Sequence, residues 1–320
     1  MMTLVRSRGR TAVLLAGLLV ATACAPVSHV VEPDAWEFEG FTVYSHVPDD
    51  PVGIVYVFHG TGGSADIANR IESVDQLNEL VERGYGWVST ESTERTGDKR
   101  WNVFDPGIAS NPDLARLTRL HTRLVDETEV DETTPIFGIG MSNGARMVTL
   151  FGQVFANEGY PVAAVAPFMG EAAPLVNLTG GLTVPAFWVI AENNTVVDND
   201  AIRADQAANA ATGAASTIVV KREEALTGFR FLRIPAIDAT ESTAIRTALV
   251  ASGVWDEQGR RVVAIDEVPG ALAGLRVPPS FGASDADVRD QIQVILALHQ
   301  FTGVFRVAVA DFFDARIAAP

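Results

Sequence analysis

The sequence predicts an α/β domain built on a doubly wound, mostly parallel sheet with helices on both faces. Short apolar segments alternate along most of the chain with longer segments of helical periodicity, which is the pattern of such a fold. The central short segments are apolar throughout, as expected of parallel strands covered on both faces. The 320 residues contain no internal repeat or low-complexity block, and they fit one large domain better than two.

The individual strands and helices follow in chain order. The expected strands are 41–46, 54–58, 87–90, 135–139, 163–168, 186–190 and 229–234. The expected helices are 66–83, 112–129, 143–157, 199–212, 240–251, 284–299 and 303–317. Asn111 before Pro112 is a cap followed by a first-turn proline, and Ser284 with Asp287 forms a capping-box pair. In a sheet of this kind, sites lie beyond the carboxyl ends of the strands.

The first residues have the composition of an export signal. Residues 1–23 carry three arginines and then an apolar run that is too short to span a bilayer. The four residues that end at Cys24 resemble a lipobox and favour lipidation of this single cysteine, although the same letters also fit an Ala-x-Ala cleavage site. We therefore expect an exported protein, either an envelope lipoprotein or a freely secreted one.

Residues 24–40 are expected to form a tether, and 41–320 the folded domain. The regular alternation changes after residue 234, and we expect an inserted cap at about 236–283. The formal net charge is −16, and loss of the signal segment removes arginines but no acids. Such an acidic chain disfavours nucleic acids and anionic membranes as partners, so a membrane contact is expected only through a lipid on Cys24.

The segment around Ser142 carries the strongest indication of chemistry. Gly140, Ser142 and Gly144 form Gly-x-Ser-x-Gly between an expected strand and an expected helix, which is the pattern of a nucleophile elbow. The glycines allow the two backbones to approach closely while the serine hydroxyl stays exposed. The same letters also occur in ordinary glycine-rich turns, but the strand and helix on either side favour a catalytic serine.

A serine nucleophile needs donors for the oxyanion that its attack creates. The His-Gly-x-Gly-Gly loop at 59–63 follows the strand 54–58, and the backbone amides of Thr61 and Asn143 are the expected pair of donors. A tight strand–helix turn is the alternative explanation of the glycines. We expect His59 to shape this loop and not to act as a base.

A base and an acid complete the expected machinery. His299 lies before the closing helix, where a chain with the order serine, acid, histidine carries its base, although it also fits a plain helix end. The acid should follow the strand 186–190, at the position that Asn194 occupies. Asparagine can hold the imidazole tautomer but cannot offset an imidazolium charge. We therefore prefer Asp198 as the acid over Asn194 and Glu192, while Asp198 could instead cap the next helix.

These motifs resemble the polyhydroxybutyrate-depolymerase-like branch of α/β-hydrolases, which includes feruloyl-esterase-type enzymes. The resemblance covers about 52–200 and rests on the blocks 59–65, 100–104, 140–147 and 163–170. It implies an α/β-hydrolase fold and ester hydrolysis. It also implies that Trp101 lies near the active-site rim and contacts the substrate, with plain packing as the alternative. Two features depart from the family: the usual Gly-x-x-Asp acid turn reads Ala-Glu-Asn-Asn at 191–194, and the cysteines of the family are absent.

Together these features predict a secreted serine esterase that forms an acyl-enzyme on Ser142 and needs no metal or organic cofactor. The substrate is a small-molecule or polymeric ester, with polyesters and aryl esters as the classes that the resemblance suggests. Two alternatives stay open from the sequence. One is a peptidase on the same fold, and the other is a lipoprotein with a hydrolase fold that binds a ligand without catalysis.

Overall fold

The computed structural model describes residues 25–272 and 285–317, which divide into two compact units. The larger unit comprises His29–Glu224 and the C-terminal segment from Ile292. The smaller unit comprises the described residues of Ala225–Gln291 together with residues 25–28. The signal segment, Cys24, Ser284 and the last part of the expected cap lie outside the described residues.

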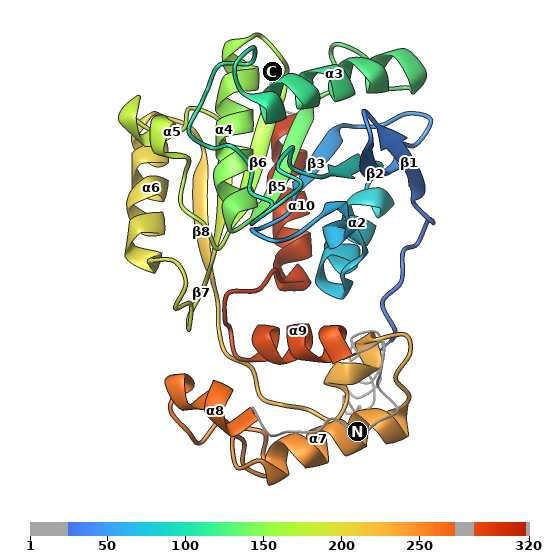
Figure 1. Ribbon diagram of the computed structural model, residues 1–320, viewed down its shortest axis with the longest axis vertical. Coiled ribbons are helices and arrows are strands. Elements are labelled where there is room, and N and C mark those ends of the chain that lie inside the picture. Colours follow the sequence, from blue (N-terminus) through green and yellow to red (C-terminus); the bar gives the residue numbers. More distant parts are fainter. Residues whose placement is uncertain (1–24, 273–284, 318–320) are drawn as a thin grey trace, which may run out of the picture. The chain divides into compact units, whose positions relative to one another are not determined.

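An eight-stranded sheet forms the centre of the larger unit (Figure 1). The strands are β1 (Asp34–Phe38), β2 (Phe41–His46), β3 (Ile54–Phe58), β4 (Gly86–Thr90), β5 (Ile136–Met141), β6 (Val162–Phe168), β7 (Ala186–Ala191) and β8 (Ser216–Lys221). Their spatial order is β1-β2-β4-β3-β5-β6-β7-β8, with β1 and β2 antiparallel and all pairs from β4 to β8 parallel. This is the strand order of an α/β-hydrolase, so the predicted fold class is confirmed.

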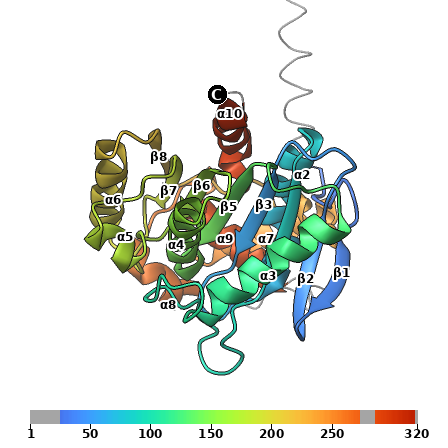
Figure 2. The ribbon, with the colours of Figure 1, turned by 90° about the horizontal axis from the view of Figure 1, so that it is seen from above.

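Helices cover both faces of this sheet (Figure 2). One apolar cluster contains side chains of α3 (Pro112–Glu127), α4 (Asn143–Asn157) and α6 (Asn199–Ala211), and the other contains side chains of α2 (Ile71–Glu82) and α10 (Arg306–Ile317). All five residues of β3 are buried, and they alternate between the two clusters. The central strands are therefore apolar throughout because both of their faces lie in a core.

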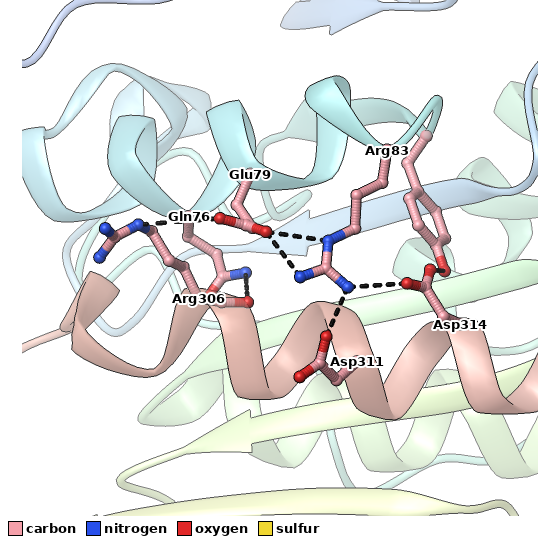
Figure 3. Close-up of polar contacts among 7 residues, drawn as sticks. Gln76, Glu79, Arg83, Arg306, Asp311 and Asp314 are labelled. Carbon is pink, nitrogen blue, oxygen red and sulfur yellow. Dashed lines mark hydrogen bonds and ion pairs between the residues drawn. The ribbon is translucent and has the colours of Figure 1, made fainter.

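A polar network joins α2 to α10 on one side of the sheet (Figure 3). The guanidinium of Arg83 lies 2.7 Å from a carboxylate oxygen of each of Glu79, Asp311 and Asp314. The hydroxyl of Tyr85 donates to Asp314 over 2.8 Å. The loop that carries His299 leads into α10. By holding α10 against α2, this network helps to fix the end of that loop.

Three expected elements are corrected by the structure. Strand β1 lies within the expected tether 24–40, and the ring of His29 stacks on Trp87 at 5.7 Å, so most of this segment is part of the folded unit. The expected strand 229–234 is a 3₁₀ helix, Arg230–Arg233, because its buried residues are Phe231 and Ile234, three apart and not two. The expected helix 284–299 ends earlier: α9 spans Asp285–Ile295.

The smaller unit is mainly helical in its described part. Helix α7 (Ala239–Ala251) begins with a capping box between Asp238 and Glu241, and α8 spans Val268–Leu272. Between them, Trp255 and Arg261 form a bridge around a turn. The described part of the expected cap, 236–272, falls within the segment that belongs to this unit. No helix of the described chain is long and apolar enough to cross a membrane.

Candidate active site

Ser142 occupies a sharp strand–turn–helix junction. Strand β5 ends at Met141 and α4 begins at Asn143. Ser142 between them has φ 58° and ψ −116°, a backbone conformation that residues other than glycine rarely adopt. A Cβ atom on Gly140 would lie 2.0 Å from the carbonyl oxygen of Gly144, and one on Gly144 would lie 2.3 Å from that of Phe58. Both flanking glycines are therefore required by close backbone packing, and the elbow has the geometry expected of it.

In the loop after β3, the backbone amide of Thr61 makes no hydrogen bond to any described residue. The carbonyl oxygen of Gly60 accepts from the backbone N–H of Gly63 at 3.1 Å and pairs with the ring of His59 at 2.7 Å, so it is directed into the loop. In a trans peptide the N–H points opposite to the carbonyl, which turns the N–H of Thr61 outward. The amides of Gly62 and Gly63 are already used, by Asp98 and Gly60.

The elbow presents the second amide in the same way. The carbonyl oxygen of Ser142 accepts from the amides of Ala145 and Arg146 in the first turn of α4. The N–H of Asn143 belongs to the same peptide group and therefore points away from the helix, as the first amides of a helix do. A Cβ atom on Gly60 would lie 3.3 Å from the Cβ of Ser142, so the two loops abut. The amides of Thr61 and Asn143 thus belong to two adjoining loops, and their role as oxyanion donors stays a prediction.

His299 lies in the loop between α9 and α10, and Asn194 is its partner. Nδ1 of His299 is 3.1 Å from Oδ1 of Asn194, which also accepts from the backbone N–H of Val196 and of Val197. These two bonds identify the Asn194 atom as oxygen, so Nδ1 of His299 must be the donor. Nε2 of His299 is then the unprotonated nitrogen, which is the form that a general base needs.

The side chain of His299 is half-buried. Its Nε2 and the Nδ2 of Asn194 are both buried, and neither has a hydrogen-bond partner in the described part of the chain. Burial lowers the pKa of His299 to about 4. The imidazole is therefore neutral at and above pH 6.

The structure brings Asn194, and not the preferred Asp198, into contact with His299. Asp198 is exposed, and its carboxylate accepts from the amide of Asp200 as the N-cap of α6. The Glu192 carboxylate instead accepts from the amide of Glu223 at 3.1 Å. Two backbone amides bind Oδ1 of Asn194 and curl the loop back on itself, which brings this residue to His299 while Asp198 is drawn into the helix start.

The buried histidines nearest the sheet have other roles. Nε2 of His59 accepts from the amide of Ser92 at 3.1 Å, which leaves its protonated Nδ1 to donate to Gly60. His121 pairs with the hydroxyl of Tyr56 at 3.0 Å. Burial lowers the pKa of both rings. Both ring nitrogens of His59 are thus bound within the loop region, and the role of His299 as the base stays a prediction.

Trp101 has the packing role that we kept as its alternative. Its side chain is 2% exposed, and the indole Nε1 donates to the carbonyl oxygen of His59 at 3.0 Å. The exposed aromatic of this segment is Phe104, which is 69% exposed. The sequence could not distinguish the two rings, because both belong to one aromatic block with no periodic pattern.

A support beneath this segment was also missed. The buried carboxylate of Asp113 accepts from the amides of Thr93 and Asn102 at 2.6 Å and 2.7 Å. Asn111 donates to the carbonyl oxygen of Asn102 at 2.8 Å, so the start of α3 holds both arms of the loop. The helix-start signal at Asn111 was visible in the sequence, but its long-range partners were not. No group of three or more metal-binding side chains occurs among the described residues.

The candidate site consists of the serine at the elbow, the free amides of Thr61 and Asn143, and the histidine that pairs with Asn194. Nε2 of His299 makes no hydrogen bond to Ser142 or to any other described residue. No family model matches the sequence, and no curated protein does. Three solved structures that are similar to the chain are an esterase of Pyrococcus furiosus, an arylesterase and an acetyl xylan esterase of Aspergillus awamori. Their identities are 15%, 14% and 12%, and their TM-scores are 0.45, 0.46 and 0.44. The matches cover 61%, 75% and 57% of this chain and 83%, 92% and 81% of those chains.

Proposed function

We propose that this protein is an exported serine esterase that hydrolyses carboxylic esters through an acyl-enzyme on Ser142. The observation that carries the proposal is the strained backbone of Ser142 between the outward amides of Thr61 and Asn143. A non-glycine residue keeps a positive φ only where the surrounding structure enforces it, and such strain is typical of functional positions. The resemblance in sequence motifs favours esters over peptides as substrates.

The residues support a two-step acyl transfer. Nε2 of His299 removes the proton of the Ser142 hydroxyl as the oxygen attacks the ester carbonyl, and the amides of Thr61 and Asn143 stabilise the oxyanion. The protonated imidazole then donates its proton to the leaving alcohol. In the second step His299 activates a water molecule, which releases the acid and restores the serine.

Asn194 orients His299 but brings no negative charge. Its Oδ1 fixes the tautomer with Nε2 free, which is one of the two tasks of the acid in a serine triad. The other task, stabilising the imidazolium, is not fulfilled, because Asn194 is neutral. Turnover is therefore expected to be slower than in a triad with a carboxylate.

The proposed location follows from the first residues of the sequence. We propose export directed by residues 1–23 and attachment to the cell envelope through a lipid on Cys24, with a freely secreted form as the alternative. Cys24 is the only cysteine of the chain, so an intramolecular disulfide does not compete for it. The acidic surface favours neutral ester substrates over polyanions.

The test is a stopped-flow burst with p-nitrophenyl butyrate combined with fluorophosphonate labelling. The wild type should release a burst of nitrophenol close to one equivalent and bind the label at Ser142. Ser142→Ala should lose both, while Ser252→Ala, which removes a hydroxyl that bonds only to the backbone of Leu249 and Val254, should keep both. Absence of burst and of label in the wild type would contradict the proposal. It would favour the non-catalytic ligand-binding protein, for which the uncharged Asn194 is the supporting observation.

A further inference from the structure

We propose that Trp101 is a positioning residue that holds the two halves of the oxyanion hole in register. This inference rests on the proposed esterase function and deepens it. Trp101 contacts both loops that supply the donors, once through its side chain and once through its backbone. It does not need to touch the substrate, because its side chain is only 2% exposed.

The first contact fixes the loop after β3. The indole Nε1 of Trp101 donates to the carbonyl oxygen of His59 at 3.0 Å, in the buried interior. The next carbonyl, that of Gly60, is held by the His59 ring and the Gly63 amide. Two successive carbonyls are thus tied inward, and the outward direction of the Thr61 N–H depends on both. Without the indole bond, the His59 carbonyl loses its donor and the loop loses one of the hydrogen bonds that hold it.

The second contact fixes the nucleophile elbow. The side-chain Oδ1 of Asn143 accepts from the backbone N–H of Trp101 at 2.7 Å, and its Nδ2 lies 3.5 Å from the Trp101 carbonyl oxygen. Asn143 is the residue whose own amide is the second oxyanion donor. By binding the side chain of Asn143, the backbone of Trp101 therefore also orients the backbone amide of Asn143.

Trp101 is itself held on all sides. Its ring packs edge-on against Phe58 at 5.3 Å and lies 5.0 Å from the ring of His59. The next residue, Asn102, is bound through its amide by Asp113 and through its carbonyl by Asn111. The start of α3 therefore anchors the backbone next to Trp101, and Trp101 in turn positions both donor amides.

The experiment compares Trp101→Phe with a matched indole deletion elsewhere. Phenylalanine keeps most of the ring contacts with Phe58 and His59 but has no N–H for the His59 carbonyl. Trp36→Phe is the control, because it also removes an indole bond, of 2.9 Å to Ser45, at the far edge of the sheet. For each protein we would measure kcat and KM with p-nitrophenyl butyrate and the inhibition constant of an alkyl trifluoromethyl ketone. The ketone forms a tetrahedral adduct on the serine, and its oxyanion occupies the hole.

Trp101→Phe should lower kcat about tenfold with KM within twofold, since removal of a whole oxyanion donor costs about 10² to 10³ and misalignment costs less. The affinity for the ketone should fall by a similar factor, and Trp36→Phe should change neither. A role in substrate contact would raise KM and leave kcat unchanged, and it would overturn the inference. An unchanged kcat and ketone affinity would do the same.

Asn143→Ala tests the link from the other side, and it carries the test if Trp101→Phe does not fold. It should lower kcat and ketone affinity by a similar factor, and the double variant should lose less than the product of the two single losses, because both act on one unit. Full multiplicativity would overturn the inference. A wild type that hydrolyses no ester contradicts the proposed function instead, whereas an active wild type with unaffected variants contradicts only the role of Trp101.

Discussion

Replacing Asn194 by aspartate should turn the neutral partner of His299 into a charged one and accelerate ester hydrolysis. The two side chains are already joined by a bond of 3.1 Å, so no rearrangement is needed. At an effective dielectric constant of about 20, two unit charges about 4 Å apart attract by about 4 kcal/mol. Each 1.36 kcal/mol corresponds to about one factor of ten in rate, so this attraction sets an upper limit of about a thousandfold.

The cost of this change falls on folding more than on rate. The second carboxylate oxygen would replace Nδ2 of Asn194, which is buried and makes no hydrogen bond within the described residues. No bond is lost, but a buried charged oxygen without a partner costs about 1–3 kcal/mol of folding free energy. We therefore expect kcat/KM to rise between tenfold and a thousandfold at pH 8, while the melting temperature falls.

The pH profile provides an independent reading of the same change. Burial lowers the pKa of His299 to about 4, so the wild-type kcat/KM should be flat through pH 6 and fall only near pH 4. A carboxylate at this distance favours the imidazolium and raises the pKa by about 1–3 units. The acid limb should move to higher pH by that amount in Asn194→Asp.

The assay is kcat/KM for p-nitrophenyl butyrate from pH 4 to pH 9. Thr195→Asp is the control, since it adds the same charge at the exposed next residue, whereas the hydrogen bond to His299 comes from Asn194. If Asn194→Asp leaves both the rate and the acid limb where the wild type has them, Asn194 is not the electrostatic partner of a working base. If Thr195→Asp reproduces both effects, the cause is general charge and not the bond to His299.

Three further outcomes are expected. Asp198→Ala should leave kcat unchanged and lower the free energy of unfolding by about 1 kcal/mol through loss of a helix cap, and a tenfold loss of kcat would restore Asp198 as the acid. The free energy of unfolding should be constant above pH 6.5 and fall between pH 6.5 and pH 4, because in this range His299 binds a proton in the unfolded state but not in the folded state. Denaturant midpoints that stay constant across this range would contradict the lowered pKa. Cys24→Ala should move the protein from the membrane fraction to the soluble fraction, and unchanged fractionation would exclude lipidation as the anchor.

The sheet and the elbow could be predicted because their signals are local. Each central strand is a short apolar run between turns, and the elbow needs glycine at two fixed positions beside Ser142. Strand β8 was missed because it is a half-exposed edge strand whose residues do not form a fully apolar run. The segment 229–234 misled because its apolar residues satisfy a 3₁₀ turn as well as a strand.

The acid position could not be predicted because two kinds of bond compete within one loop. Asp198 has the right charge, but the first turn of α6 offers it a free backbone amide at short range. Asn194 has the right spacing from β7, and its Oδ1 binds two amides of its own loop as well as His299. Residue type favoured Asp198, whereas backbone geometry selected Asn194.

The neutral side chain of Asn194 beside His299 affects the relative rates of acylation and deacylation. In the proposed mechanism, both steps of acyl transfer pass through an imidazolium at His299, and Asn194 offers no carboxylate to stabilise it. The first step expels an activated leaving group such as nitrophenol. The second step requires His299 to deprotonate water, which is a weak acid, and this deprotonation is costly without a carboxylate partner. Loss of charge should therefore slow deacylation more than acylation for activated esters, so that the acyl-enzyme accumulates. A burst followed by slow turnover in the wild type, with the slow phase accelerated in Asn194→Asp, is the kinetic pattern that this site should give.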